Sequence, residues 1–148
     1  MTAALDAIVA PIVLGTDFGP ASASAERTAI RAAAELGADL VIVNAIDLRR
    51  LQLPGGRWRE RVDQARARRE RSAAALVAEA RAAGVSARTL IWSGDPATCV
   101  ADAARAEGAA RIVLGSHRRG AIARAVGGSV SRRVIELAEC PVEVVASE

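Results

Sequence analysis

Two segments of the chain carry residue types that can hold an anionic ligand. The first is Gly15-Thr16-Asp17-Phe18-Gly19, where a carboxylate directly follows an apolar run. The second begins at Gly115-Ser116-His117-Arg118-Arg119-Gly120 and reaches Gly127-Gly128-Ser129-Val130-Ser131. Glycine before a helix exposes backbone N–H groups, and the helix dipole favours an anion such as phosphate there. Together the segments predict a nucleotide pocket: Gly115, Gly128 and Ser129 hold phosphates, and Asp17 accepts a hydrogen bond from base or ribose.

Each of these residues also has a purely structural interpretation. Asp17 can form an Asx-turn at the end of a strand, and Ser129 can simply cap its helix. His117 beside Ser116 does not make a catalytic triad, because sequence neighbours on a loop do not supply its geometry and the G-x-S-x-G motif is absent. We expect His117 to be a solvent-facing loop residue.

The basic residues exclude several kinds of chemistry. All 20 of them are Arg, since the chain has neither Lys nor Tyr, and this removes the P-loop Lys, a Schiff-base Lys and any Tyr acid. The single His117 and the two cysteines, Cys99 and Cys140, are too few for a metal site of several His or Cys ligands. We therefore expect no metal and no catalytic residues, and a binding function rather than strong turnover.

The composition is that of one globular domain spanning residues 1–148, with 51% hydrophobic and 25% charged residues. The longest stretch without a charge, Ala7 to Thr16, is about half of what spans a bilayer, and Asp6 without early basic residues is unlike a secretory signal. The net charge of +3 is spread along the chain, and three aromatic residues offer no platform for stacking bases. We expect a cytoplasmic protein that binds neither nucleic acid nor membrane.

Short helices that end in glycine and are followed by apolar runs recur along the chain. The glycines are Gly37, Gly84 and Gly108, and glycine after a helix adopts the left-handed conformation without strain. Five strands are expected in the runs 12–16, 38–43, 85–92, 109–114 and 142–145. Their alternation with helices predicts an α/β fold with a doubly wound parallel sheet.

The helices differ in their surfaces. Asp95-Pro96 is a helix start that places Cys99 on the core side, and the last helix begins at Gly128-Ser129 and stops before Cys140-Pro141. From Arg57 to Arg71 a further helix holds seven Arg against Glu60, Asp63 and Glu70. We interpret it as a solvated face with ion pairs; a surface for an anionic partner is the alternative.

The motifs, in this order, resemble the universal stress protein family from about Pro11 to Val145. The resemblance rests on Thr16-Asp17-Phe18, Asn44-Ala45-Ile46-Asp47, Gly94-Asp95-Pro96, the two glycine segments described above and Cys140-Pro141-Val142-Glu143-Val144-Val145. It implies a sheet in the order 3-2-1-4-5 and frequent homodimers, which we assign to the last strand, with ATP binding in one branch of the family. It also implies that Ala45 and Leu114 form an apolar wall beside Asp17.

The ATP-binding branch has the pattern Gly-x2-Gly-x9-Gly-Ser/Thr, which this chain departs from at one position. Counted from Gly115, the last element falls on Gly128-Ser129 but the middle Gly falls on Arg118. Arg cannot copy the close backbone approach of glycine, so Arg118 either blocks the pocket or pairs with phosphate through its guanidinium.

The leading hypothesis is a stress-response and signalling protein that binds an adenine nucleotide, ATP, as a ligand. One alternative is an enzyme with slow ATP hydrolysis or adenylate transfer in the same pocket. Another is an interaction module without nucleotide that uses the Arg-rich helix. The residues predicted to contact the nucleotide are Gly15, Thr16, Asp17, Ala45, Leu114, Gly115, Arg118, Gly128, Ser129, Val130 and Ser131.

Overall fold

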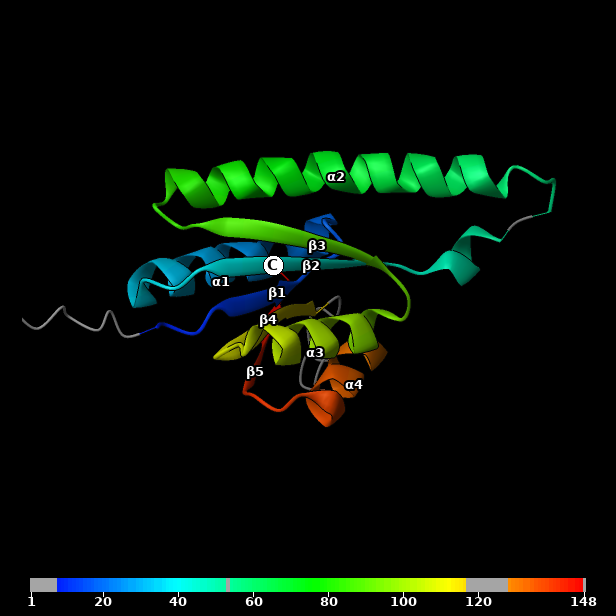
Figure 1. Ribbon diagram of the computed structural model, residues 1–148. Helices are drawn as coiled ribbons and strands as arrows, with labels where there is room; N and C mark the ends of the chain where they lie inside the picture. The colour runs from blue at the N-terminus through cyan, green and yellow to red at the C-terminus, as the bar shows by residue number, and fades with distance from the viewer. Residues whose placement is uncertain (1–7, 53, 117–127, 148) are drawn as a thin grey trace, which may run out of the picture.

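Five apolar runs form one parallel sheet in the computed structural model, which describes residues 8–52, 54–116 and 128–147. The strands are β1 (Ile12–Gly15), β2 (Leu40–Ile46), β3 (Ala87–Ser93), β4 (Arg111–Ser116) and β5 (Val142–Ala146). Their order in the sheet is β3-β2-β1-β4-β5 (Figure 1). This confirms the predicted α/β class, and also the strand order that the family resemblance implies.

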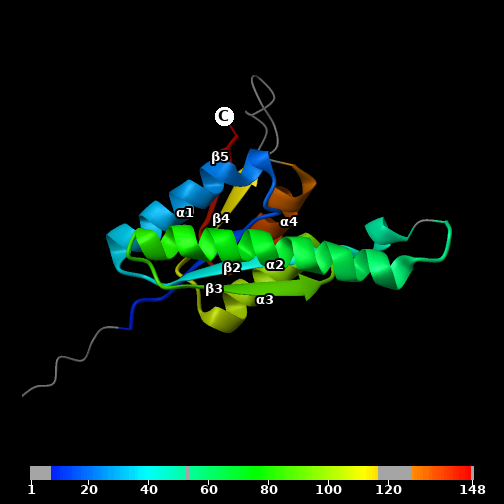
Figure 2. The ribbon, with the colours of Figure 1, turned by 90° about the horizontal axis from the view of Figure 1, so that it is seen from above.

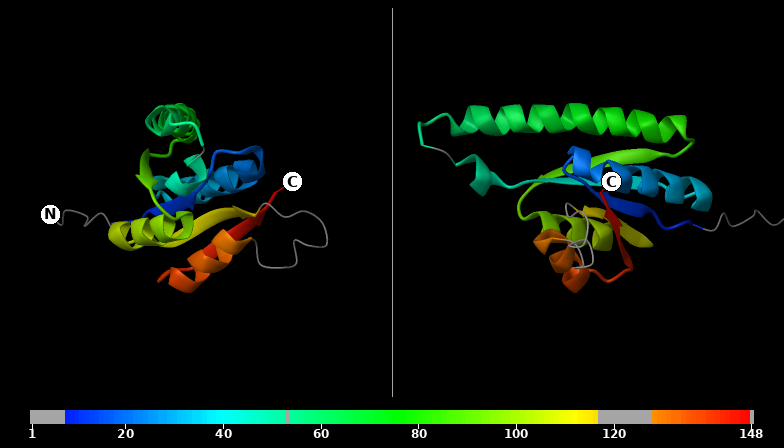
Figure 3. Two further views of the ribbon diagram at one scale, coloured as in Figure 1. Left: turned by 90° about the vertical axis from the view of Figure 1, so that its right-hand side faces the viewer. Right: turned by 180° about the vertical axis from the view of Figure 1, so that it is seen from behind.

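Helices cover both faces of the sheet. They are α1 (Ala23–Leu36), α2 (Trp58–Ala82), α3 (Pro96–Glu107) and α4 (Ser129–Leu137), with the short 3-10 helices η1 (Pro20–Ser22) and η2 (Leu48–Leu51). α1 and α2 lie on one face, and α3 and α4 on the other (Figure 3). Gly37 and Gly108 end their helices with φ of 63° and 60°, as the sequence predicted. No helix in the described ranges is long and apolar enough to cross a membrane.

The centre of the sheet is buried on both faces. Ile12 and Leu14 of β1 pack beneath α1, and Val13 between them packs beneath α3; all three are 0% exposed. Strands buried on both faces are expected in a parallel sheet covered by helices, and they read as continuous apolar runs. Small side chains bring α1 close to the sheet, because its buried residues are Ala25, Ala29 and Ala33. The core thus fixes the ends of the central strands in space.

All five strands differ from the expected runs by one to three residues at one end or at both. β2 continues to Ile46, so that it includes the polar Asn44 beyond the apolar run, which ends at Val43. The family resemblance places Asn44-Ala45-Ile46-Asp47 at the end of this strand, in agreement with the structure. α4 ends at Leu137 with Ala138 extended, before the Cys140-Pro141 stop. The start of α3 is as predicted, since the Asp95 carboxylate accepts a hydrogen bond from Thr98 N at 3.0 Å. Cys99 is 7% exposed, which confirms its place in the core.

α2 is the longest helix, with 25 residues. Figure 2 shows it crossing above β2 and β3, with its N-terminal part extending past the sheet beside η2. Its buried residues are Ala65, Ala73, Leu76 and Ala80. Arg57, the N-cap of α2, forms an ion pair with Glu60 at 4.0 Å. Arg61, Arg66 and Arg69 also donate hydrogen bonds to the backbone carbonyl oxygens of Leu51, Ile91 and Ala45.

Candidate functional site

A cavity of about 470 Å³ lies beyond the carboxyl ends of β1, β2 and β4. In a doubly wound sheet this is the point where the strand order reverses, and ligands bind at such points. The predicted site residues that line it are Gly15, Thr16, Asp17, Ala45, Leu114, Gly115, Gly128, Ser129, Val130 and Ser131. Arg118 lies outside the described residues, as does the neighbouring His117. The structure thus brings together around one cavity all of the predicted residues that it describes.

The tip of β1 is a tight turn stabilised by its own side chains. Asp17 Oδ1 accepts hydrogen bonds from Gly19 N at 2.7 Å and from Ser22 Oγ at 2.9 Å. Phe18 has a φ of 62°, unusual for a residue with a side chain, and its N–H donates to Thr16 Oγ1 at 2.9 Å. The Asx-turn interpretation of Asp17 is therefore confirmed. The same turn holds the Asp17 side chain in the cavity wall.

Behind this turn lies a partly buried carboxyl group. Thr16 Oγ1 donates to Glu26 Oε1 of α1 at 2.8 Å. Burial raises the pKa of Glu26 above its ordinary value of 4.5, although the Thr16 bond opposes the shift; the charges of Glu79 and Asp17 add to it. The native state therefore holds a proton on Glu26 more tightly than the unfolded chain does.

Replacing Glu26 with Gln is expected to stabilise the protein at pH 7. A raised native pKa means that stability present below the ordinary pKa of 4.5 is lost as pH rises through the native pKa. Gln copies the protonated form, and its Oε1 still accepts from Thr16. In urea unfolding at pH 7, the free energy of unfolding of E26Q should be larger than that of the unmodified protein. This difference should become smaller toward pH 4. Glu35→Gln, on an exposed part of α1, is the control for losing one acid; an E26Q protein less stable than E35Q at pH 7 would contradict the assignment.

A buried amide connects the tips of β1 and β2. Asn44 is 2% exposed, and its Nδ2 donates to the carbonyl oxygen of Thr16 at 2.7 Å. Its Oδ1 accepts from Arg69 NH1 at 2.8 Å, and the same nitrogen donates to Ala45 O at 3.2 Å. Both polar ends of the amide are satisfied, as a buried polar group requires. Asn44 and Arg69 line the cavity, and neither was among the predicted contact residues.

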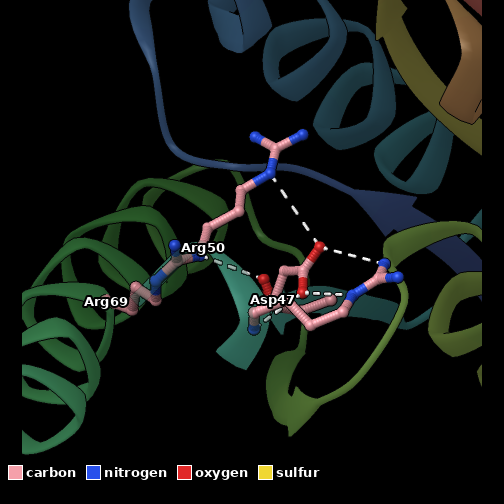
Figure 4. A network of polar contacts seen from close by, with 5 residues as sticks. Asp47, Arg50 and Arg69 are labelled. Carbon is pink, nitrogen blue, oxygen red and sulfur yellow. Dashed lines mark hydrogen bonds and ion pairs between the residues drawn. The ribbon is translucent and has the colours of Figure 1, made fainter. Parts of the chain in front are cut away.

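The β2 side of the cavity is rich in guanidinium groups. Asp47 follows β2 and accepts from Arg49 Nε at 3.2 Å, while Arg50 Nε lies 3.9 Å from its other oxygen. The hydrogen bond from Arg49 lowers the pKa of Asp47 below its ordinary value. Figure 4 shows Arg50 and Arg69 coming from different elements to the surroundings of Asp47. Arg50, Asp47 and Arg69 are all part of the cavity wall.

The β4 side of the cavity contains the start of α4. Gly128 is the N-cap and provides no side-chain cap, so Ser129 is the first residue of the helix and not the cap that the structural interpretation expected. Ser131 is 4% exposed, and Val130 40%. A glycine N-cap offers no side-chain acceptor to the first backbone N–H groups of α4, and such groups bind anions at helix starts.

Gly115 has a structural reason to be glycine. A Cβ on it would lie 3.2 Å from the Cα of Ser22, part of the backbone of η1. A larger residue would push η1 and the β1 tip away from β4. Gly115 therefore allows η1 and the tip of β1 to pack against β4. This structural role is independent of any contact between Gly115 and a ligand.

The described residues contain no group of three or more His, Cys, Asp or Glu side chains placed to bind a metal ion. The polar groups at the cavity are instead carboxylates, guanidinium groups, hydroxyls and backbone amides. Such a set can bind a ligand that combines an anionic part with hydrogen-bonding groups.

The fold and the cavity place the chain in the class of doubly wound α/β proteins with a ligand-sized cavity at the strand-order reversal. Within this class, residues 9–146 match the sequence model of the universal stress protein family. The chain belongs to that family.

Known relatives agree with this assignment. A universal stress protein of Mycolicibacterium smegmatis is 34% identical over an alignment of 143 residues that covers 91% of this chain; the chain spans 45% of the length of that relative. A solved structure of a family member from Burkholderia pseudomallei superposes with a TM-score of 0.75 at 28% identity, covering 92% of this chain and 96% of the other. The universal stress protein from Archaeoglobus fulgidus in complex with dAMP has a TM-score of 0.69 at 26% identity, covering 93% and 98%.

Proposed function

We propose that the cavity binds an adenine nucleotide, ATP, as a ligand in a stress-response signalling role. The observation that carries the proposal is one cavity at the strand-order reversal, between the Asp17 turn and the start of α4 with its glycine N-cap. Its volume of about 470 Å³ is in the range of small-molecule sites. The Archaeoglobus fulgidus relative, structurally similar over 93% of this chain, binds dAMP.

In the proposed complex the two sides of the cavity have different roles. The phosphates lie at Gly115 and at the backbone N–H groups of Gly128 and Ser129, where the helix dipole is favourable. Asp17 accepts a hydrogen bond from the ribose or the base. Ala45 and Leu114, both in the cavity wall, provide the apolar contact for the base.

The nucleotide acts as a ligand rather than as a substrate that is turned over. The chain contains no Lys, which removes the usual cation of phosphoryl-transfer loops. The Asp17 carboxylate is already committed to Gly19 and Ser22 through its Oδ1. These observations favour binding over slow ATP hydrolysis or adenylate transfer.

Calorimetric titration of the purified protein with ATP tests the proposal. We expect saturable binding with one site per chain, and no release of ADP, AMP or phosphate when the mixture is separated by chromatography over several hours. Binding with product formation would replace the ligand role by an enzymatic one. No heat and no retention of ATP in equilibrium dialysis would reject the nucleotide function.

We also propose that the chain forms a homodimer through β5. This strand lies at one edge of the sheet, where one side of its backbone has no partner strand within the described chain. Its residues Val142, Val144 and Val145 are only partly buried, and Glu143 is its one charged residue. An exposed, largely apolar edge invites a second strand.

A further inference from the structure

Arg69 is directed at the cavity by the packing of α2. It stands four residues from Ala65 and four from Ala73, both 2% exposed against the sheet, so it lies on the buried stripe of the helix. The small alanines leave room for a long side chain to extend toward Asn44. Arg69 is thereby the arginine of α2 that reaches the cavity wall at the β2 end.

The hydrogen bonds of Arg69 do not neutralise its charge. Its NH1 donates to Asn44 Oδ1 and to Ala45 O, which are both neutral acceptors. Its Nε and its second terminal nitrogen make no hydrogen bond with the described residues, and no carboxylate there lies within ion-pair distance. Burial lowers the pKa of this guanidinium, which Asp17 partly offsets from a distance. A partly buried cation with unused donors is a recognition group for an anion.

The surroundings supply no carboxylate in direct contact with Arg69. Asp47 is the acidic side chain of the cavity on the β2 side, and it already pairs with Arg49 at 3.2 Å and Arg50 at 3.9 Å. The negative charge that acts on Arg69 is the more distant Asp17, which lines the same cavity. Because Arg50 and Arg69 both line the cavity, the excess positive charge faces the ligand space (Figure 4).

This cationic end is separate from the phosphate site proposed at α4. Gly15 of β1 is paired with Val43 of β2 on one side and with Leu114 of β4 on the other. The two ends of the cavity are thus about two strand spacings apart, on the order of 10 Å. A nucleotide that binds α4 with its 5′-phosphate therefore extends across β1 toward Arg69.

We propose that the cavity recognises nucleotides with a second phosphate on the ribose, at the 3′ or 2′ position, and that Arg69 binds this phosphate. The inference rests on the proposed nucleotide function and names the substrate class of the same cavity. The 5′-phosphate occupies the α4 start. The oxygens of the ribose phosphate accept hydrogen bonds from the unused N–H groups of Arg69. Arg50 is a second cation beside this phosphate.

A comparison of two ligands of similar charge tests the proposal. ADP carries both phosphates at its 5′ end, whereas adenosine 3′,5′-bisphosphate carries one at each side of the ribose. We expect the bisphosphate to bind the full-length protein at least about tenfold more tightly than ADP, as charge-assisted hydrogen bonds at a cavity wall allow. Adenosine 2′,5′-bisphosphate, titrated in parallel, shows which ribose position is preferred.

Variants of α2 assign the preference to Arg69. Arg69→Gln should reduce the ratio of the affinity for adenosine 3′,5′-bisphosphate to the affinity for ADP to near one. The affinity for ADP itself should stay within about threefold of that of the unmodified protein. Arg71→Gln removes the same charge from an exposed position of the helix, and should keep the ratio. If Arg69→Gln fails to fold, Arg69→Lys takes its place: it keeps the charge but loses the planar pair of donors, and should lower the ratio several-fold.

The outcomes separate this inference from the nucleotide function. If ADP binds and neither bisphosphate binds more tightly, the ribose-phosphate site is wrong and nucleotide binding stands. If Arg69→Gln weakens ADP and the bisphosphates equally, Arg69 supports the shared part of the ligand and the inference fails. If none of the nucleotides binds, both proposals fall.

Discussion

Substituting Asp17 with Ala should weaken ATP binding by about 1–3 kcal/mol, or roughly 5- to 150-fold in affinity. Two effects add. The carboxylate leaves the cavity wall, where it is proposed to contact ribose or base, and the turn loses the acceptor of Gly19 N and Ser22 Oγ. Calorimetric titration measures the affinity, and circular dichroism shows whether the fold is retained.

Asp17→Asn separates the two effects. The amide keeps an oxygen that accepts from Gly19 N and Ser22 Oγ, so the turn survives, but the negative charge is gone. If the asparagine variant binds as weakly as the alanine variant, the carboxylate itself contacts the nucleotide. If it binds like the unmodified protein, the turn is what matters. Unchanged affinity in a folded Asp17→Ala protein would remove Asp17 from the site.

The fold could be predicted from the sequence because its signals are local and agree with one another. Three of the five apolar runs follow a helix that ends at a glycine, and Gly37 and Gly108 take the left-handed conformation that this requires. The end of β2 could not be placed in this way. Asn44 is polar and interrupts the apolar pattern, and it fits inside a strand only because Thr16 O and Arg69 satisfy its amide.

Most of the cavity wall could also be predicted, because the carboxyl ends of parallel strands meet at one edge of the sheet. Arg69 could not. Seven arginines stand in the range from Arg57 to Arg71, and the two alanines among them, Ala65 and Ala67, do not by themselves show which face of α2 is buried. Only the packing of Leu76 and Ala80 on the sheet sets the rotation of the helix, and with it the arginine that turns inward. The four-residue spacing from Ala65 and Ala73 was the available signal.

The β5 edge has a defined set of unpaired groups. Alternate residues of a parallel strand direct their N–H and C=O groups to the same side. Ile112 N donates to Pro141 O, and Ser147 N donates to Ser116 O. The backbone groups of the odd-numbered residues in the range 141–147 therefore form the hydrogen bonds with β4. The groups of Val142, Val144 and Ala146 therefore face away from the sheet. Two copies of β5 related by a twofold axis can pair through them as antiparallel strands, in a closed contact.

Val144→Pro should dissociate such a dimer and leave the protomer folded. Proline removes the outward N–H of Val144 and is tolerated on the free side of an edge strand, so the pairing with β4 persists. Val145→Pro is the matched control: its N–H points to β4, so it should destabilise the protomer itself. Light scattering at micromolar concentration should give a dimer mass for the unmodified protein and a monomer mass for Val144→Pro, with thermal unfolding reporting the fold. A monomer mass for the unmodified protein, or a dimer that survives Val144→Pro, would show that β5 does not form the interface.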